Sequence, residues 1–194
     1  MENSVNKSNV TLRIAQKTEL DKFKTDLQEA FRISAEKEFG HALDEPIPSD
    51  LDFEDSVKCA GAIVYQVLLD ENIVGGAIVA IDEVSQHNKL LLFFIATNCH
   101  SKGVGYEAWK AIEKKHPKTK VWETTTPYFE KRNIHFYVNK CGFKIVEYFS
   151  KYHPDPNQKS DSNFDEQDDE MFKFEKQMWK FSHLFLSNSS NILI

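Results

Sequence analysis

Several features are scarce or missing in this 194-residue sequence, and each absence excludes a class of protein. The three cysteines are odd in number and form no C-x-x-C pair, so neither a disulfide framework nor a cysteine zinc site is indicated. No H-E-x-x-H, EF-hand, P-loop or G-x-S-x-G pattern occurs, which excludes the common metalloprotease, calcium, P-loop nucleotide and serine-hydrolase sites. We therefore expect no bound metal.

Long apolar runs and a secretion signal are also missing. The longest apolar run, residues 90–96, is seven residues long, whereas a membrane-spanning helix needs about 20. The first residues do not show the basic and then apolar pattern of a signal peptide. These absences predict a cytoplasmic protein with no membrane partner.

Basic residues are outnumbered, with 24 Lys and Arg against 30 Asp and Glu, for a net charge of −6. A general nucleic-acid binder is excluded, because neutralising phosphates requires clustered positive charge. Apolar residues make up 41% of the chain and aromatic residues 12%, enough for the core of one globular domain. We expect a disordered N-terminus at 1–9, a single domain at 10–180 and a C-terminal tail at 181–194.

Hydrophobic periodicity predicts an alternation of strands and helices. A first helix is indicated by apolar residues at three- and four-residue steps: Leu20, Phe23, Leu27 and Phe31. Residues 36–55, with eight acids, one lysine and two prolines, predict a loop with short helical pieces. The expected strands are 10–14, 63–69, 73–81, 90–96, 120–123, 142–149 and 171–179, and the later helices are 104–115 and 128–140. This order predicts an α/β fold with a mixed sheet.

The most informative segment is a glycine loop between the strand expected at 90–96 and the helix expected at 104–115. Only seven glycines occur in the chain, and Gly103 and Gly105 both lie in this loop, in the sequence H-S-K-G-V-G at 100–105. Glycine lets backbone N–H groups turn toward a ligand, and a helix N-terminus carries partial positive charge, so such a loop can hold a phosphate. A tight turn followed by a helix start would give the same pattern.

Charge is distributed unevenly around this loop. Residues 102–151 contain 11 basic and 5 acidic side chains, a local net charge of +6, which leaves −12 for the rest of the chain. An acidic protein that gathers positive charge around a glycine loop is suited to a polyanionic ligand. Lysines on solvated helix faces account for part of this excess.

The loop also fits a dinucleotide-binding pattern. Residues 103–108 match G-x-G-x-x-G/A, and Glu123 lies twenty residues further on, where an acidic residue would bind a ribose. In that fold, however, the strand runs directly into the first glycine, whereas six residues intervene here. A dinucleotide-dependent oxidoreductase is therefore the weaker hypothesis.

Two motifs in this region are similar to those of a known family. Residues 100–105, H-S-K-G-V-G, lie between a strand and a helix, as does the family form Q/R-x-x-G-x-G/A. Residues 133–143, N-I-H-F-Y-V-N-K-C-G-F, resemble the form N-x-x-x-x-F/Y-Y-x-x-x-G-F. With the element order, these motifs make residues 10–178 resemble the GNAT superfamily of N-acetyltransferases. The resemblance implies a mostly antiparallel central sheet flanked by helices, and His100 departs from the family pattern, where Gln or Arg is usual.

The resemblance implies that acetyl-CoA is the acetyl donor, and it assigns residues that bind it. The pyrophosphate would lie on the loop and on the start of the helix that follows. The pantetheine arm would lie along the strand that ends near residue 97, bonded to backbone at Ile95 and Thr97, with Asn133 facing it from the later helix. The loop residues assigned in this way are His100, Ser101, Lys102, Gly103, Val104, Gly105 and Tyr106.

The resemblance also implies how the acetyl group is transferred. Tyr137 is the candidate general acid, which would protonate the departing CoA thiolate while an amine attacks the acetyl carbonyl directly. Asn133 and Tyr137 are four residues apart, so a helix would place both on one face. A buried aromatic residue is the alternative interpretation of Tyr137. Glu123, at a strand end, is the first candidate for the general base, and Asp82 and Glu83 come next.

The acceptor is expected to be a small cationic amine, such as a polyamine, an amino sugar or a lysine-like group. The acidic segment 36–55 corresponds to the region that walls the acceptor site in family members, and its carboxylates would attract such an amine. A solvated acidic loop explains the same composition. A noncatalytic acyl-CoA-binding or regulatory module is the second hypothesis. The apolar residues of the tail at 181–194 would dock on the body or on the second subunit of a homodimer, or remain unordered.

Overall fold

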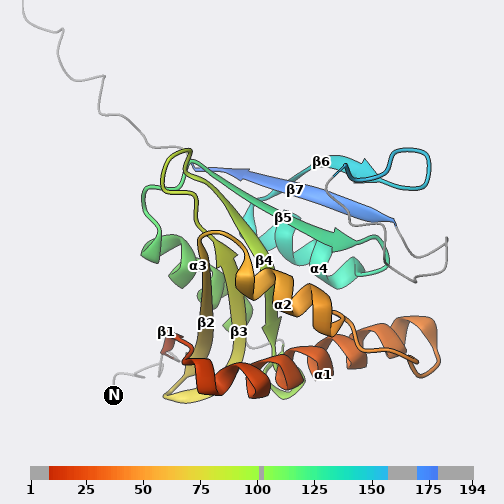
Figure 1. Ribbon diagram of the computed structural model, residues 1–194, viewed down its shortest axis with the longest axis horizontal. Helices are drawn as coiled ribbons and strands as arrows, with labels where there is room; N and C mark the ends of the chain where they lie inside the picture. The colour runs from red at the N-terminus through yellow and green to blue at the C-terminus, as the bar shows by residue number, and fades with distance from the viewer. Residues whose placement is uncertain (1–8, 101–102, 157–169, 179–194) are drawn as a thin grey trace, which may run out of the picture.

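The computed structural model describes residues 9–100, 103–156 and 170–178. They form an α/β fold around one sheet with the strand order β1-β2-β3-β4-β5-β7-β6 (Figure 1). The tail expected at 181–194 and nearly all of the segment expected at 1–9 lie outside the described residues. The strands are β1 (Val10–Ile14), β2 (Ala62–Leu69), β3 (Asn72–Ala80), β4 (His87–Ile95), β5 (Val121–Pro127), β6 (Lys144–Phe149) and β7 (Met171–Gln177).

Helices separate these strands in the expected order. The α-helices of the described residues are α1 (Leu20–Phe39), α2 (Asp50–Lys58), α3 (Val104–Lys115) and α4 (Lys131–His135), and α4 continues into a π-helical turn, Phe136–Cys141. β4 and β5 are parallel, while all other neighbouring strands are antiparallel. The predicted mixed, mostly antiparallel sheet is therefore confirmed. Within these ranges, none of the helices combines the length and the apolar character that crossing a membrane requires.

β2 and β3, which correspond to the strands expected at 63–69 and 73–81, form a hairpin. The strands end at Leu69 and resume at Asn72, so the turn consists of Asp70 and Glu71 alone. Both turn residues have positive φ angles, 47° and 71°, as the tight turns that suit a twisted hairpin require. The antiparallel register that follows places β3 in the middle of the sheet, beside β4.

The first helix is longer than predicted. The sequence placed residues 36–39 in an acidic loop, but α1 continues to Phe39 and ends at Gly40, which has a left-handed φ of 76°. Arg32 forms an ion pair of 2.7 Å with Glu36, one turn further along α1. This acidic residue therefore stabilises the helix and does not begin a loop. The helical piece expected further along is α2, whose start is capped by Ser49 and Asp52.

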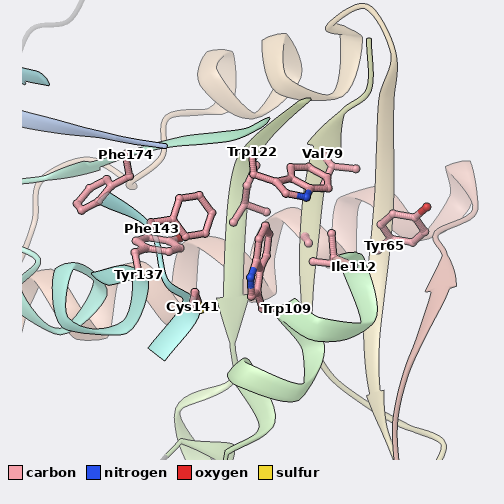
Figure 2. Packing of buried hydrophobic residues seen from close by; sticks show 11 residues of the cluster. Tyr65, Val79, Trp109, Ile112, Trp122, Tyr137, Cys141, Phe143 and Phe174 are labelled. Carbon is pink, nitrogen blue, oxygen red and sulfur yellow. The ribbon is translucent and has the colours of Figure 1, made fainter. Parts of the chain in front are cut away.

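The helices cover both faces of the sheet (Figure 1). On one face, Phe23 and Leu27 of α1 and Phe53 of α2 join a buried cluster with side chains of β2, β3 and β4. On the other face, α3 and the π-helical turn pack on the sheet. There Trp109 of α3 packs edge to face against Trp122 of β5, with ring centroids 5.3 Å apart and an interplanar angle of 74°, and Figure 2 shows the two side chains together.

The sheet opens between its two parallel strands. β4 and β5 pair only over residues 87–89 and 121–123, and they then diverge, as Figure 1 shows. At the point of divergence the Thr124 hydroxyl donates to the Leu90 carbonyl at 2.9 Å. Beyond this bond the C-terminal half of β4 has β3 on one side, and no strand of the described residues pairs with it on the other. Its free edge can therefore accept an extended ligand.

Candidate cofactor and acetyl-transfer site

A cavity of about 810 Å³ lies beside the C-terminal half of β4, past its last pair with β5. Its wall combines α1, the end of β4, the start of α3, and α4 with its π-helical turn. Of the predicted cofactor residues, the structure brings these to the wall: Ile95, His100, Gly103, Val104, Gly105, Tyr106 and Asn133. Thr97 lies next to them in a short 3-10 helix and is not part of the wall. Ser101 and Lys102 lie outside the described residues.

The start of α3 supplies backbone donors to this cavity. Gly103 precedes the helix with φ 77°, a conformation that other residues rarely adopt. The first helical hydrogen bond runs from the Glu107 N–H to the Gly103 carbonyl at 3.1 Å. The N–H groups before Glu107 therefore have no acceptor within the helix and, with the helix dipole, favour an anion.

The free edge of β4 points its backbone at the same cavity. The Ala96 N–H donates to the Val74 carbonyl of β3 at 2.8 Å. Because successive residues of a strand turn their backbone groups to opposite sides, the N–H and carbonyl of Ile95 face away from β3. The Ile95 carbonyl already accepts a bond of 2.6 Å from His100 Nε2, which leaves the Ile95 N–H for a ligand.

His100 also holds an arginine that sequence analysis did not single out. Arg132 of α4 lines the cavity and donates to His100 Nδ1 at 2.5 Å. A ring that donates from Nε2 and accepts at Nδ1 is neutral, and burial, followed by the nearby Arg132 charge, lowers the pKa of His100 despite the opposing effect of the Ile95 carbonyl. The Arg132 guanidinium therefore lies beside His100, the loop residue that occupies the position where the resembled motif usually has Gln or Arg. The sequence signal for Arg132 was only its place among the bases of residues 102–151.

Tyr137 lies deeper than the sequence suggested. Its side chain is 6% exposed, packs against Phe136, Phe143 and Phe174 at centroid distances of 5.5–5.6 Å, and is not part of the cavity wall (Figure 2). Burial raises the pKa of its hydroxyl, while a hydrogen-bonding interaction with the Thr124 side chain lowers it. Thr124 lies where β4 and β5 diverge. The Tyr137 phenol is therefore close to the start of the free edge of β4.

Asn133 and Tyr137 have different surroundings although they are four residues apart, and a π-helical turn begins between them. In the resembled motif three residues separate the tyrosine from the glycine, whereas four residues, 138–141, lie between Tyr137 and Gly142. A π-helical turn absorbs one residue more than an α-helical turn, and this one starts at Phe136. Asn133 and Phe136 line the cavity, whereas Tyr137 belongs to the buried core cluster.

The carboxylates proposed as bases lie away from the cavity wall. Glu123 is held between Lys89 and Lys173, at 3.3 and 3.1 Å. Asp82 accepts bonds from the backbone and hydroxyl of Ser85, which lower its pKa and fix a turn, and Glu83 follows it in that turn. None of the three lines the cavity.

Glu130, at the start of α4, is the carboxylate that sequence analysis missed. It lines the cavity, is 6% exposed and accepts a bond of 3.2 Å from the Ser34 hydroxyl of α1. Burial is the main cause that raises its pKa. No sequence signal pointed to it, because Ser34 lies 96 residues away in the chain.

The acidic segment 36–55 contributes no residue to the cavity wall. Several of its carboxylates bond neighbours on their own helices or across to α1. Glu36 pairs with Arg32, Glu54 with Lys58, and Asp50 with Lys24. The prediction that this segment walls the acceptor site finds no support in the cavity's lining.

Comparisons with known proteins agree with this architecture. The profile of the acetyltransferase (GNAT) family matches residues 21–143. Over 179 residues the chain is 47% identical to the uncharacterized protein YrkN of Bacillus subtilis (strain 168). The aligned region covers 90% of this chain and 97% of that protein. A Bacillus subtilis acetyltransferase solved in complex with CoA has a TM-score of 0.62 at 16% identity, covering 88% of this chain and all of that one.

A further solved structure is the spermidine N-acetyltransferase of Vibrio cholerae in complex with CoA and spermine. It has a TM-score of 0.60 at 12% identity and covers 87% of this chain and 95% of that one. At such identities the solved structures show a shared fold, while the profile match spans more than half of the chain. By its sequence and by its fold, this chain belongs to the acetyltransferase (GNAT) family, whose members use acyl-CoA.

Proposed function

We propose that this protein transfers an acetyl group from acetyl-CoA to the primary amine of a small cationic acceptor, by direct attack of the amine. The observation that carries the proposal is the cavity itself, in which the open edge of β4 leads to the unbonded N–H groups at the start of α3. A thioester on a long arm that ends in a pyrophosphate matches both features.

The cofactor would lie across the wall in an extended form. Its pyrophosphate would bond the backbone between Ser101 and Tyr106, and Arg132 would add the positive charge that His100 lacks. Its pantetheine arm would run along β4, where the Ile95 N–H is available, with Thr97 at the loop end and Asn133 opposite. Each of these groups comes from an element that already lines the cavity, apart from Ser101, Lys102 and Thr97.

The chemistry requires a donor of one proton at the sulfur. The amine nitrogen attacks the acetyl carbonyl, the C–S bond breaks, and the thiolate takes a proton from Tyr137. The phenol carries its proton at neutral pH, as a donor must, although burial raises the pKa of Tyr137 and makes it a weaker acid than an exposed tyrosine. A backbone N–H on β4 would stabilise the negative charge on the carbonyl oxygen. Glu123 remains a proposed base, with two lysine partners that argue against it.

A cationic acceptor is supported by the carboxylate of Glu130 in the cavity. The name of one fold relative, a spermidine N-acetyltransferase bound to spermine, points to the same class of amine. Polyamines, amino sugars and lysine-like amines therefore form the first set of acceptors to test.

The test is an assay of CoA-thiol release with acetyl-CoA and this panel of amines. The proposal predicts release that depends on the amine, and Tyr137→Phe should lower turnover while the affinity for acetyl-CoA is kept. Phe172→Leu, which alters a ring that is not on the cavity wall, is the matched control for a change in the aromatic core. Binding of CoA without thiol release across the panel would instead support a noncatalytic acyl-CoA-binding module. A thermal shift with NADH alone would support the oxidoreductase.

A further inference from the structure

Glu130 is a buried carboxylate without a cationic partner in the described part of the chain. Its Oε2 accepts the Ser34 hydroxyl, and Oε1 accepts no hydrogen bond from the described residues. Burying a carboxylate is unfavourable unless a positive charge or several hydrogen bonds compensate it. Glu130 has one side-chain hydrogen bond and no ion pair among the described residues, and a buried carboxylate of this kind on the wall of a ligand cavity is typical of a functional group.

The cations near Glu130 are engaged elsewhere. Arg132 lies two residues on, but it bonds His100. Lys131 pairs with Glu38 of α1 at 3.0 Å, and Glu38 adds a second negative charge on this side of the cavity. The groups that face Glu130 are thus Ser34 and Glu38 from α1 and Arg132 from α4, with no ammonium group among them.

We propose that Glu130 binds the ammonium group of the acceptor and takes its proton, as the general base of the reaction. The inference rests on the proposed acetyl transfer and deepens it. A proton leaves the R–NH₃⁺ group for a carboxylate oxygen of Glu130, and the freed lone pair forms the C–N bond to the acetyl carbon. The C–S bond breaks, the thiolate takes a proton from the general acid, and the second proton that the attacking nitrogen loses restores that acid. The net products are the amide, the CoA thiol and one proton, which Glu130 passes to solvent.

The surroundings of Glu130 suit both steps. Ser34 holds one carboxylate oxygen, which leaves the other for the ammonium. Burial raises the pKa of Glu130, and a base whose pKa lies nearer neutrality takes and returns a proton more readily at physiological pH. Glu130 also raises the pKa of Tyr137, so the base and the proposed acid lie within electrostatic range of one another. Phe31 and Ala30 of α1 line the same cavity and offer an apolar wall for the carbon chain of the amine.

Steady-state kinetics of Glu130→Gln on the full chain, with acetyl-CoA and the amine that wild type uses best, test the inference. The glutamine side chain can still accept the Ser34 bond, so the change removes the charge and keeps the shape. At pH 7 we expect kcat/KM for the amine to fall about 100-fold, within the range of a lost general base, with the KM for acetyl-CoA unchanged. The rate of the variant should recover about tenfold per pH unit toward the pKa of the amine, because a neutral amine needs no base.

Two further variants make the outcome unambiguous. Glu54→Gln removes a carboxylate that is paired with Lys58 on α2, away from the cavity wall, and should leave kcat/KM within about twofold of wild type. Ser34→Ala should lower kcat/KM and move the acid limb of the pH profile to higher pH, because the Ser34 bond lowers the pKa of Glu130. This variant serves if Glu130→Gln does not fold. Wild-type kinetics in Glu130→Gln would overturn the role of Glu130 but not the proposed acetyl transfer. Where Glu130→Gln does not fold, wild-type kinetics in Ser34→Ala would have the same meaning. Absence of thiol release from wild type with every amine would overturn both.

Discussion

Replacing Gly103 by alanine separates backbone strain from cofactor binding, because Gly40 offers a matched control. Gly103 precedes α3 with φ 77°, Gly40 follows α1 with φ 76°, and in both cases a Cβ atom would meet no described atom within 4 Å. Both substitutions therefore impose the same left-handed conformation on an alanine and neither creates a clash with the described residues.

The size of the stability change follows from these two observations. Holding an L-residue in the left-handed region costs about 1–2 kcal/mol. Alanine also allows the unfolded chain fewer conformations than glycine does, which offsets about 0.4–1 kcal/mol of this loss in stability. Each variant should therefore lose about 1 kcal/mol of unfolding free energy, which lowers the melting temperature by about 2–4 °C in a chain of this size.

The functional consequence should differ between the two variants. The added methyl group at Gly103 occupies open space ahead of α3, where the pyrophosphate is proposed to lie, while Gly40 is not on the cavity wall. Chemical denaturation should give equal stability losses, and only Gly103→Ala should raise the KM for acetyl-CoA, by about tenfold or 1.4 kcal/mol. An unchanged KM in both variants would refute the pyrophosphate position. A much larger stability loss at Gly103 alone would refute the strain argument.

Three further predictions concern the cofactor loop and the sheet beneath it. Arg132→Ala should raise the KM for acetyl-CoA about tenfold to 100-fold, as expected for a lost charged hydrogen bond. The KM for acetyl-pantetheine, which has no pyrophosphate, should not change. Equal effects on both donors would show that Arg132 does not bind the pyrophosphate. Gly76→Ala should destabilise the fold by about 1–3 kcal/mol, because a Cβ there overlaps the Phe23 ring of α1, and a stability like that of wild type in thermal melts would contradict this packing. Since the pKa of His100 lies below its usual value near 6.5, the unfolded chain binds a proton before the folded chain does, so stability is full above about pH 6.5 and declines below it. His100→Gln should weaken that decline in melts at pH 5 and 7, whereas an identical pH dependence would show that His100 does not contribute.

Local features of the fold could be predicted because neighbouring residues decide them. The turn at Asp70 and Glu71 and the glycine loop before α3 each follow from the conformations that a few adjacent residues allow. The apolar steps of α1 likewise located its buried face at Phe23 and Leu27. The end of α1 was missed, because the acidic composition of residues 36–55 indicated a loop, whereas the helix continues to Gly40, whose left-handed φ ends it.

The candidate site was predicted less completely, because side-chain direction and charge compensation are not local. Tyr137 is buried in the core while Asn133 and Phe136 line the cavity, although the spacing from Asn133 suggested a shared face. Glu123 has the right type and position for a base, yet Lys89 and Lys173 reach it from strands on either side.

The sequence by itself determined the family, the element order and the loop at Gly103, because these depend on periodicity, turn chemistry and motifs of a few residues. Only the tertiary structure decided which charged groups meet in the cavity. Packing α1 beside α4 brings Ser34 to Glu130 across 96 residues, and the end of β4 brings His100 to Arg132 across 32. Contacts of this kind form only when distant elements pack together, so no local pattern in the chain can specify them.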